Sequence, residues 1–370
     1  MKKIGLICEY NPLHNGHVYH YEKVKELSNA DYVILSLSST LTQRGELAIL
    51  DKFIRTNLAL EMGVDLVLEC PSLLSMNEAA IFAKAHIKNL YLAGVDEIWI
   101  GAEDGNSNMY EEYHKIINTP SFKKKINEFL EEGISYKESF NKAFSFLNYS
   151  PLKSNDMLGY FYYDAIKEIC PNVKLMTIKR TNSYTENTLN QTNIQSASAI
   201  RNNLDASSYY VPSYTKKYLN EVLDENKLVP FIKYNIINHS LKSLAESSEG
   251  LENRLEKSFG NTFKELVDNI KTKRYSESKI RRLLMDTCFL ITKEDVNKAI
   301  NSMNYLRVLG FNKNGQKLIN EIKTKTDVYM NIKNGINATL DFELKISKTL
   351  DIIYGTNLLK QEITKPIIKK

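Results

Sequence analysis

The sequence predicts an α/β protein, in which a Rossmann-like parallel sheet is followed by a mainly helical, basic part. Two observations lead to this prediction. In residues 1–205, short apolar runs typical of buried strands alternate with helical stretches, which implies βαβ crossovers and a parallel sheet. In residues 206–370, helical patterns dominate. The net charge of this part is +9, whereas that of residues 1–205 is −4. A chain of 370 residues is also too long for one small core, so we expect two domains, 1–205 and 206–370.

The expected strands of the first domain are apolar runs bounded by turn residues. They are 3–8, 32–37, 64–69, 97–100 and 174–178. The expected helices between them are 17–24, 51–60, 75–92 and 157–169, with Asp51 as the cap of the second. Because ligands of such sheets bind beyond the carboxyl ends of the strands, motifs that follow those ends should converge.

The most informative motif is His14-Asn15-Gly16-His17, directly after the first strand. Asn11-Pro12 ends that strand, and a helix begins near His17. Free backbone N–H groups and the helix dipole favour phosphate at such a place, and Gly16 lets a phosphate approach the backbone closely. Two imidazoles add donors for charge that builds on phosphate oxygens. A surface turn that happens to contain histidines is the alternative interpretation.

The second motif is Ser196-Ala197-Ser198-Ala199-Ile200-Arg201, which follows the fifth strand and should open a helix. Alone, the serines would be helix caps and Arg201 a surface residue. Together with the histidine motif, however, it resembles the nucleotidylyltransferase superfamily, whose members attack the α-phosphate of ATP and release pyrophosphate. In that superfamily such a run ends in an arginine and grips the β- and γ-phosphates, a role that suits a bidentate guanidinium.

Smaller signals lie between the two motifs. Gly101 ends the fourth strand, where a residue without a side chain allows a nucleobase or ribose near the backbone. Asn155 could cap a helix or bind the ligand. Arg180 follows the fifth strand and points toward the expected cleft, whereas the ion pair of Gln43-Arg44-Gly45-Glu46 could be only a clasp within a loop.

The second domain contains no catalytic constellation in its sequence. We expect helices at 213–219, 251–258, 261–271 and 277–288, and short strands near 327–330 and 343–346. The densest basic cluster of the chain is the window 271–282, with six basic residues and one acidic residue. Such a cluster suits a polyanion, although a solvated lysine-rich surface is the alternative.

Other classes of protein are disfavoured by composition. No apolar run approaches the roughly 20 residues of a membrane span, and Met1-Lys2-Lys3 leads into a strand rather than a signal peptide. The four cysteines are far apart in the sequence and form no metal-type pair, so we expect buried, reduced thiols and a cytoplasmic protein. We expect no protein-held metal site. The oligomeric state is left open.

Several longer stretches closely resemble the bacterial tRNA(Met) cytidine acetate ligase family. They are Glu9–His20, Gln43–Glu46, Asp51-Lys52, Gly63–Pro71, Ser196–Arg201 and Tyr305–Phe311, so the similarity runs through most of the chain. The family joins an ATP-binding nucleotidylyltransferase domain to a helical tRNA-binding part. It activates acetate as acetyl-adenylate and then acetylates N4 of the wobble cytidine of elongator tRNA(Met).

The resemblance implies ATP as a substrate, accompanied by Mg²⁺, with His14, His17 and Arg201 as catalytic residues. The implied ATP contacts are Ile7, Cys8, Glu9, Tyr10, Asn11, Pro12, Leu13, His14, Asn15, Gly16, His17, Val18, Tyr19, His20, Gly101, Asn155, Arg180, Ser196, Ser198 and Arg201. The basic window is the expected tRNA contact, through Lys273, Arg274, Tyr275, Lys279, Arg281 and Arg282.

Two other functions stay open on the sequence alone. One is a small-molecule adenylyltransferase that makes a nucleotide cofactor, with the basic half serving oligomerisation. The other is an RNA-binding protein whose nucleotide site is only regulatory. The basic half argues against the first and the complete pair of motifs against the second. The sequence does not indicate the basis of acetate selectivity, how the tRNA is discriminated, or a base for acetyl transfer.

Overall fold

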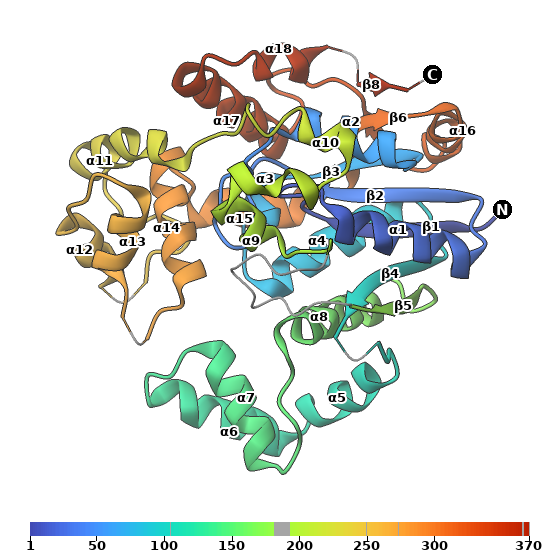
Figure 1. Cartoon of the computed structure of the whole chain (residues 1–370). Helices are drawn as coiled ribbons and strands as arrows, with labels where there is room; N and C mark the ends of the chain where they lie inside the picture. Colours follow the sequence, from blue (N-terminus) through green and yellow to red (C-terminus); the bar gives the residue numbers. More distant parts are fainter. Residues whose placement is uncertain (104, 181–192, 249, 273, 365, 370) are drawn as a thin grey trace.

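A computed structural model describes residues 1–103, 105–180, 193–248, 250–272, 274–364 and 366–369 (Figure 1). Its centre is an eight-stranded sheet with the order β5-β4-β1-β2-β3-β6-β7, and β8 pairs with β6. The strands are β1 (Lys3–Cys8), β2 (Tyr32–Ser38), β3 (Leu66–Cys70), β4 (Glu97–Ala102), β5 (Lys174–Lys179), β6 (Tyr305–Phe311), β7 (Asp327–Tyr329) and β8 (Ile367–Ile368).

The five strands expected in the first half are confirmed, and all four contacts between them are parallel. The strand order changes direction at β1, because β2 pairs with one of its edges and β4 with the other. Such a switch point leaves a crevice at the carboxyl ends of the two diverging strands, where ligands of open α/β sheets bind. The histidine motif follows β1 and Gly101 lies in β4, so both stand at this crevice.

Helices bury both faces of the sheet. The helices of the first half are α1 (Asn15–Ser28), α2 (Lys52–Met62), α3 (Ser72–Ser75), α4 (Ala79–Leu92), α5 (Met109–Ile117), α6 (Pro120–Glu131), α7 (Tyr136–Phe146), α8 (Ser154–Ile169) and α9 (Ala197–Asn202). Val33 and Leu35 of β2 belong to one apolar core with α1 and α2, whereas Ile34 belongs to the other core with α4 and α8. This alternation explains the almost continuous apolar runs, since neither face is left to water.

The second half adds helices beside the sheet and then returns to it. Its helices are η1 (Leu204–Tyr209), α10 (Ser213–Lys216), η2 (Glu225–Leu228), α11 (Val229–Asn238), α12 (Leu251–Glu256), α13 (Phe263–Ile270), α14 (Glu277–Phe289), α15 (Lys293–Ser302), α16 (Lys313–Ile322), α17 (Ala338–Tyr354) and α18 (Leu358–Ile363). β6 pairs antiparallel with β3. The sheet therefore contains strands from both sides of position 205/206. The division into two domains at this position stays a prediction.

One expected strand of the second half is present and one is wrong. Residues 327–329 form β7, but 343–346 lie inside α17. Asn337 caps that helix through a hydrogen bond to the Thr339 N–H, and Gly355 ends it in a left-handed conformation. The short apolar run near 343 was misleading because buried helices and buried strands share such runs, and the helix ends lie outside it.

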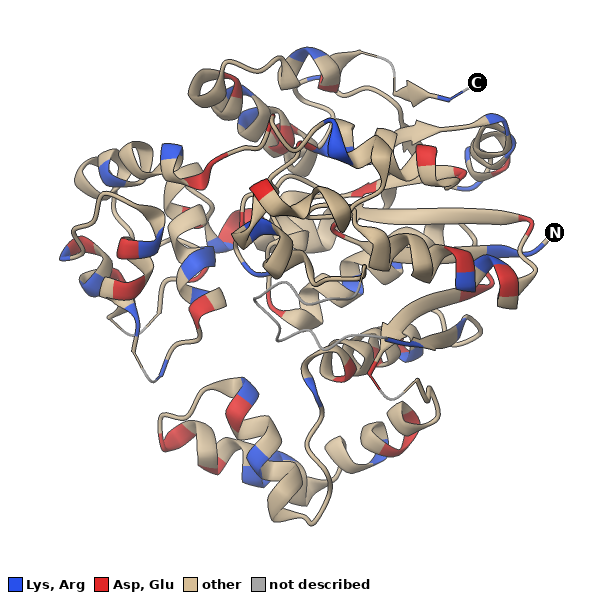
Figure 2. Cartoon of the chain, viewed as in Figure 1, with Lys and Arg blue, Asp and Glu red and all other residues tan. Residues whose placement is uncertain are grey.

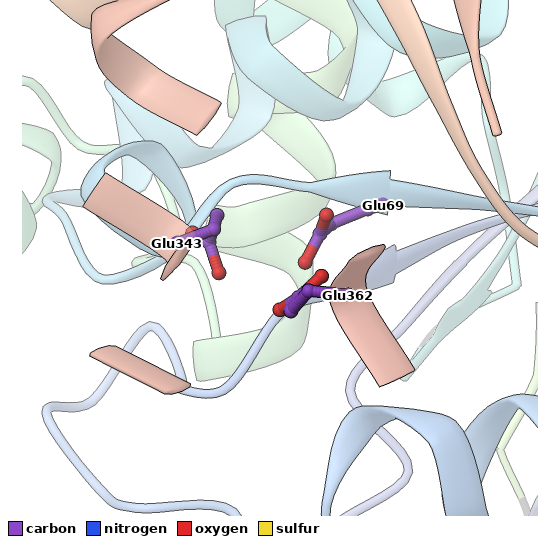
Figure 3. Close-up of side chains that lie close together, drawn as sticks. All are labelled: Glu69, Glu343 and Glu362. Carbon is purple, nitrogen blue, oxygen red and sulfur yellow. The ribbon is translucent and has the colours of Figure 1, made fainter. Parts of the chain in front are cut away.

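A buried ionic cluster joins the last two helices to the sheet. Figure 3 shows Glu69 of β3, Glu343 of α17 and Glu362 of α18 converging on one point. Three carboxylates at this spacing could hold a metal ion, but Nζ of Lys52 already forms ion pairs with all three, at 3.1 Å in the case of Glu343. Arg307 of β6 adds a contact to Glu362 at 3.4 Å. Lysine and arginine thus supply the positive charge that the carboxylates require.

Two helical lobes flank the carboxyl ends of the strands: α5–α7, and the lobe that contains α11–α14 (Figure 1). Figure 2 shows basic and acidic residues mixed on both lobes rather than separated by sign. Among the residues that the structure describes, no helix is both long enough and apolar enough to cross a bilayer.

Candidate active site

A large cleft lies between the sheet and the two lobes. Its volume is about 1030 Å³, and its wall includes the ends of β1, β4 and β5. Tyr136 and Lys137 of α7 line it from one lobe, and Ser278 and Lys279 of α14 line it from the other. The cleft therefore connects the crevice of the sheet, where nucleotides bind in such folds, with the end of the basic window.

The two motif histidines are held by the start of α1. His14 is the N-cap of the helix, and its Nδ1 accepts a hydrogen bond from the Gly16 N–H at 3.1 Å. Nδ1 of His17 accepts the backbone N–H of His14 at 3.2 Å. The two rings stack with centroids 3.8 Å apart. Since each Nδ1 accepts a hydrogen bond, the proton of each neutral imidazole is on Nε2, which leaves that nitrogen as a donor.

The surroundings of both histidines favour the neutral form of the ring. Burial lowers the pKa of His14 to about 3, and the positive charges of Arg180 and Arg201 act in the same direction. Burial also lowers the pKa of His17 well below its ordinary value, with His14 and Arg180 as further causes. The pair therefore offers two oriented N–H donors rather than two positive charges, while nearby arginines provide the charge.

Two glycines of the motifs leave room for their neighbours. A Cβ on Gly16 would lie 2.9 Å from Cε1 of His14, so any side chain there would displace the ring. At Gly101 a Cβ would lie 3.3 Å from Cγ of Arg180. The sequence suggested that these glycines make room for the ligand. In the structure each also makes room for a side chain of the site.

Arg180 lies beside the histidines, as its place after β5 suggested. Its backbone N–H donates to the Ala102 carbonyl at 2.9 Å, which holds the end of β5 against β4. Its positive charge contributes to the lowered pKa of His14, His17 and His20. A cation at this position favours a phosphate group beside the same imidazoles.

Arg201 also reaches the cleft, but its guanidinium already has partners. Nη1 donates to the Asn11 carbonyl and Nη2 to Oε1 of Glu46, both at 2.8 Å. Each Nη carries a second hydrogen, so donors are left for a phosphate oxygen. Ser196 caps α9 through a hydrogen bond from the Ala199 N–H at 3.1 Å and lines the cleft, whereas Ser198 is half-buried outside the cleft wall.

The remaining predicted ATP contacts divide into two groups. Those that line the cleft are Ile7, Cys8, Glu9, Tyr10, Asn11, Gly16, Tyr19, His20, Gly101 and Asn155. Pro12, Leu13, Asn15 and Val18 do not line it. Asn15 instead donates its side-chain amide to the carbonyls of Asn193 and Tyr209. Asn155 does not cap α8, whose N-cap is Lys153; its Nδ2 donates to Glu103 at 3.0 Å.

The basic window is only partly exposed. Arg274, Tyr275 and Lys279 line the cleft, and Lys273 lies outside the described residues. Arg282 also lines the cleft, but its side chain is largely buried and forms an ion pair with Glu246. Arg281 pairs with Glu225 at 2.5 Å and lies over the Phe263 ring, so much of its charge is used within the protein.

Sequence reasoning missed two parts of the site. The first is the loop that contains Gln43-Arg44-Gly45-Glu46, which carries part of the family resemblance but was not among the predicted contacts. The Gln43 N–H donates to Glu9 at 2.7 Å, and the Gln43 carbonyl accepts from Arg282 at 3.5 Å, so the loop connects β1 with α14. The second is α7, whose residues Tyr136 and Lys137 belong to no motif that could have revealed them.

Comparison with known proteins agrees with this architecture. The profile of the HIGH nucleotidyl transferase family matches residues 1–365. The tRNA(Met) cytidine acetate ligase of Clostridium novyi is 35% identical, with 95% of this chain and 96% of that protein covered. The protein of the same name from Oceanobacillus iheyensis is 32% identical over the full length of both chains.

Solved structures give the same result. TmcAL of Thermotoga maritima matches with a TM-score of 0.88 and 26% identity, with 100% of this chain and 99% of that chain covered. A second structure of that protein, bound with alpha-thio ATP, matches with a TM-score of 0.83 and 27% identity over the same shares of the two chains. Together with the histidine motif at the switch point of the sheet, these similarities establish that the chain belongs to the HIGH nucleotidyl transferase family and, within it, to the tRNA(Met) cytidine acetate ligase family.

Proposed function

We propose that this protein uses ATP to activate acetate as acetyl-adenylate and transfers the acetyl group to N4 of the wobble cytidine of elongator tRNA(Met). The observation that carries the proposal is the single cleft that runs from His14 and His17 to the start of α14. A ligase with two half-reactions requires such continuity, because the activated acid must meet its acceptor without leaving the enzyme.

In the first half-reaction an acetate oxygen attacks the α-phosphorus of ATP, and the bond to the β-phosphate oxygen breaks. The Nε2–H groups of His14 and His17 donate to oxygens on which negative charge builds. Arg180 and Arg201 add positive charge, and Arg201 and Ser196 hold the departing pyrophosphate. Ser198 has no direct role in this proposal, because it does not line the cleft. Mg²⁺ enters with the triphosphate, and we assign no protein ligand to it.

In the second half-reaction the cytidine amine attacks the acetyl carbon, the bond to AMP breaks, and N4 loses a proton. An exocyclic cytidine amine is a weak nucleophile, so its placement against the activated acyl group supplies much of the rate. Tyr275 offers a ring on which an unpaired base can stack, with Arg274 and Lys279 beside it for phosphates. Arg281 and Arg282 act indirectly, by holding α14 in place. A protein that works on ATP and tRNA would act in the cytoplasm.

The test is pyrophosphate exchange into ATP, measured with and without acetate and with and without tRNA. Exchange that needs acetate but no tRNA, followed by acetate-dependent formation of N4-acetylcytidine in elongator tRNA(Met), is the expected result. A rate of exchange that does not depend on acetate but increases with an added mononucleotide would instead indicate an adenylyltransferase that makes a nucleotide cofactor. Absence of exchange, with tRNA binding intact, would indicate a regulatory nucleotide site.

A further inference from the structure

Glu46 places a carboxylate in the wall of the cleft, beside a group that we expect to bind phosphate. It lies in the loop between β2 and α2, and it lines the cleft together with Asn11 and Arg201. A negative charge at this position repels a triphosphate, and the repulsion is stronger where water is partly excluded. The carboxylate therefore needs a role that outweighs this repulsion.

Hydrogen bonds join Glu46, Arg201 and Asn11 in a closed ring. Nη2 of Arg201 donates to Oε1 of Glu46, and Nη1 of Arg201 donates to the Asn11 carbonyl, both at 2.8 Å. The side-chain amide of Asn11 donates to Oε2 of Glu46 at 3.3 Å, which closes the ring. The three residues come from the segment after β1, the loop before α2 and helix α9, so the ring joins three separate parts of the cleft wall.

The loop holds Glu46 in place before any ligand binds. The Glu46 N–H donates to Oγ1 of Thr42 at 3.2 Å, and the Glu46 carbonyl accepts the Thr42 N–H at 3.0 Å. The Gly45 N–H donates to the Thr42 carbonyl at 3.0 Å, which closes the turn. Only 18% of the Arg201 side chain and 19% of the Glu46 side chain are exposed, so this pair is less screened by water than a surface ion pair.

A guanidinium that is already fixed binds phosphate better than a mobile one. A free arginine side chain has many rotamers, and it loses this conformational entropy when it binds a ligand. In the ring, Nη1 and Nη2 of Arg201 each use one hydrogen and keep one. The remaining donors are therefore held in a fixed geometry, which lowers the entropy that binding must overcome.

We propose that Glu46 is a positioning residue that acts through Arg201, by holding the guanidinium where it binds the pyrophosphate part of ATP. The inference rests on the proposed function, in which Arg201 holds the departing pyrophosphate. It differs from a simple clasp between the loop and α9 in what it predicts. Glu46 should matter for the half-reaction that releases pyrophosphate, but not for acetyl transfer from acetyl-adenylate to tRNA, which involves no pyrophosphate.

Two variants of Glu46 separate its hydrogen bond from its charge. Glu46→Ala removes the acceptor, whereas Glu46→Gln keeps a carbonyl oxygen for Arg201 without the negative charge. The matched control is Glu168→Ala, because Glu168 pairs with Lys84 at 2.6 Å on the surface and does not line the cleft. Each variant is assayed for binding of inorganic pyrophosphate, for acetate-dependent adenylate formation, and for acetyl transfer to tRNA from chemically prepared acetyl-adenylate.

We expect Glu46→Ala to lose roughly 10- to 150-fold in kcat/KM for ATP, the effect of one hydrogen bond to a charged group, and to bind pyrophosphate more weakly. Glu46→Gln should recover about half of this loss on a logarithmic scale, because a bond between two ions is roughly twice as strong as a neutral one. Acetyl transfer from acetyl-adenylate should keep its wild-type rate in both variants, and Glu168→Ala should match the wild type in all three assays.

A double-mutant cycle tests whether Glu46 acts through Arg201. In the Arg201→Ala background, Glu46→Ala should cause no further loss of adenylate formation, because no guanidinium is left to hold. A further loss as large as in the wild-type background would show that Glu46 acts independently of Arg201 and would overturn the proposal.

Three other results would also overturn it. Tighter pyrophosphate binding by both Glu46 variants would show that the carboxylate only repels anions. Equal losses in the two half-reactions would show a purely structural role, and wild-type values for Glu46→Ala in all assays would show no role at all. Pyrophosphate binding requires neither acetate nor tRNA, so it tests Glu46 separately: if the wild-type protein forms no adenylate from ATP and acetate, the proposed function fails instead.

Discussion

At the scale of single residues, the site depends on which nitrogen of each histidine carries a proton. Backbone N–H groups at the start of α1 occupy Nδ1 of His14 and His17, so Nε2 is the donor in both. The neutral state of both rings follows from their burial beside two arginines. Donors that are oriented before the substrate arrives need no reorganisation when charge develops.

The first prediction separates the cap of His14 from its donor. His14→Asn can still accept the Gly16 N–H but has no N–H at the position of Nε2, whereas His14→Ala loses both. Both variants should lose roughly 10²–10³ in the rate of acetate-dependent adenylate formation. Only the alanine variant should also lose stability, by about 1 kcal/mol. Pyrophosphate exchange and urea unfolding measure the two effects. Normal exchange by His14→Asn would contradict the role given to Nε2.

The second prediction concerns pH. Burial lowers the pKa of His14 and His86 to about 3 and that of His20 to about 4, from an ordinary value of 6.5. The unfolded chain therefore binds more protons than the folded one below pH 6.5. Above pH 6.5 the neutral histidines cost the folded protein no stability. As the pH falls below 6.5, protonation of the unfolded chain lowers the free energy of unfolding.

For each such histidine, the free energy of unfolding should fall by about 1.4 kcal/mol between neutral pH and pH 5.5. Urea unfolding at pH 7.5, 6.5 and 5.5 measures the slope, and His20→Gln should make it smaller. The control is the wild-type protein with ATP present, where phosphate beside His14 should raise its pKa and weaken the dependence. An equal midpoint at all three pH values would show that these rings are not held neutral.

At the scale of elements, α14 is tied to the cleft at the end of β1 by the loop before α2. Gly45 has a φ of +74°, and a Cβ there would collide with the backbone of Arg282, so the loop and the helix lie directly against each other. Arg55 of α2 holds the other side of that loop, since it donates to the carbonyls of Glu9, Ser38 and Leu50 at 2.8–2.9 Å. The element expected to bind RNA is thereby connected to the end of β1.

The third prediction distinguishes the cations of the basic window that line the cleft from exposed lysines of the same lobe that do not. Arg274→Ala with Lys279→Ala should weaken tRNA binding, with adenylate formation preserved. The log–log salt dependence of binding should flatten by about 0.7–0.9 for each phosphate that the variant no longer neutralises. The matched control is Lys257→Ala with Lys264→Ala, which removes two exposed lysines of the same lobe that do not line the cleft. Equal slopes for the two double variants would place the RNA elsewhere.

At the scale of the whole molecule, elements of the second half complete the sheet that the first half begins. β6 extends the sheet beyond β3, and the cluster of Lys52 with three glutamates joins α17 and α18 to the same edge. Burial raises the pKa of Glu343, whereas the charge of Lys52 overcomes the effect of burial and holds that of Glu69 below its ordinary value. The intact cluster adds little to the free energy of unfolding, but removal of its cation leaves buried carboxylates without a partner and is strongly destabilising.

The fourth prediction tests that requirement. Lys52→Met removes the positive charge from three buried carboxylates and should destabilise the protein by about 3–5 kcal/mol or more. The loss should be smaller at pH 5 than at pH 7.5, because protonated glutamates no longer need the cation. Lys84→Met is the control: Lys84 pairs with Glu168 on the surface, where both side chains are largely exposed, and its loss should change stability by less than about 1 kcal/mol. Equal urea midpoints for the two variants would contradict the role of Lys52.

The five parallel strands and the place of the histidine motif could be predicted because their signals are local. A run such as Tyr32–Ser38 shows burial on both faces in its own composition, and a histidine motif directly after a strand marks a helix N-terminus. The resemblance to a known family likewise depended on contiguous motifs. These features need only the order of neighbouring residues.

The tertiary structure alone decided the features that join distant parts of the chain. The burial of Arg282 depends on Glu246 and on the loop at Gly45, and the pairing of β6 with β3 joins residues more than 200 positions apart. Burial and the charge of Arg180 lower the pKa of His20 to about 4, and neither cause is visible in the sequence of α1. Charge, hydrogen bonding and burial at these positions depend on which surfaces meet, and a pattern along one segment carries no information about its partner in space.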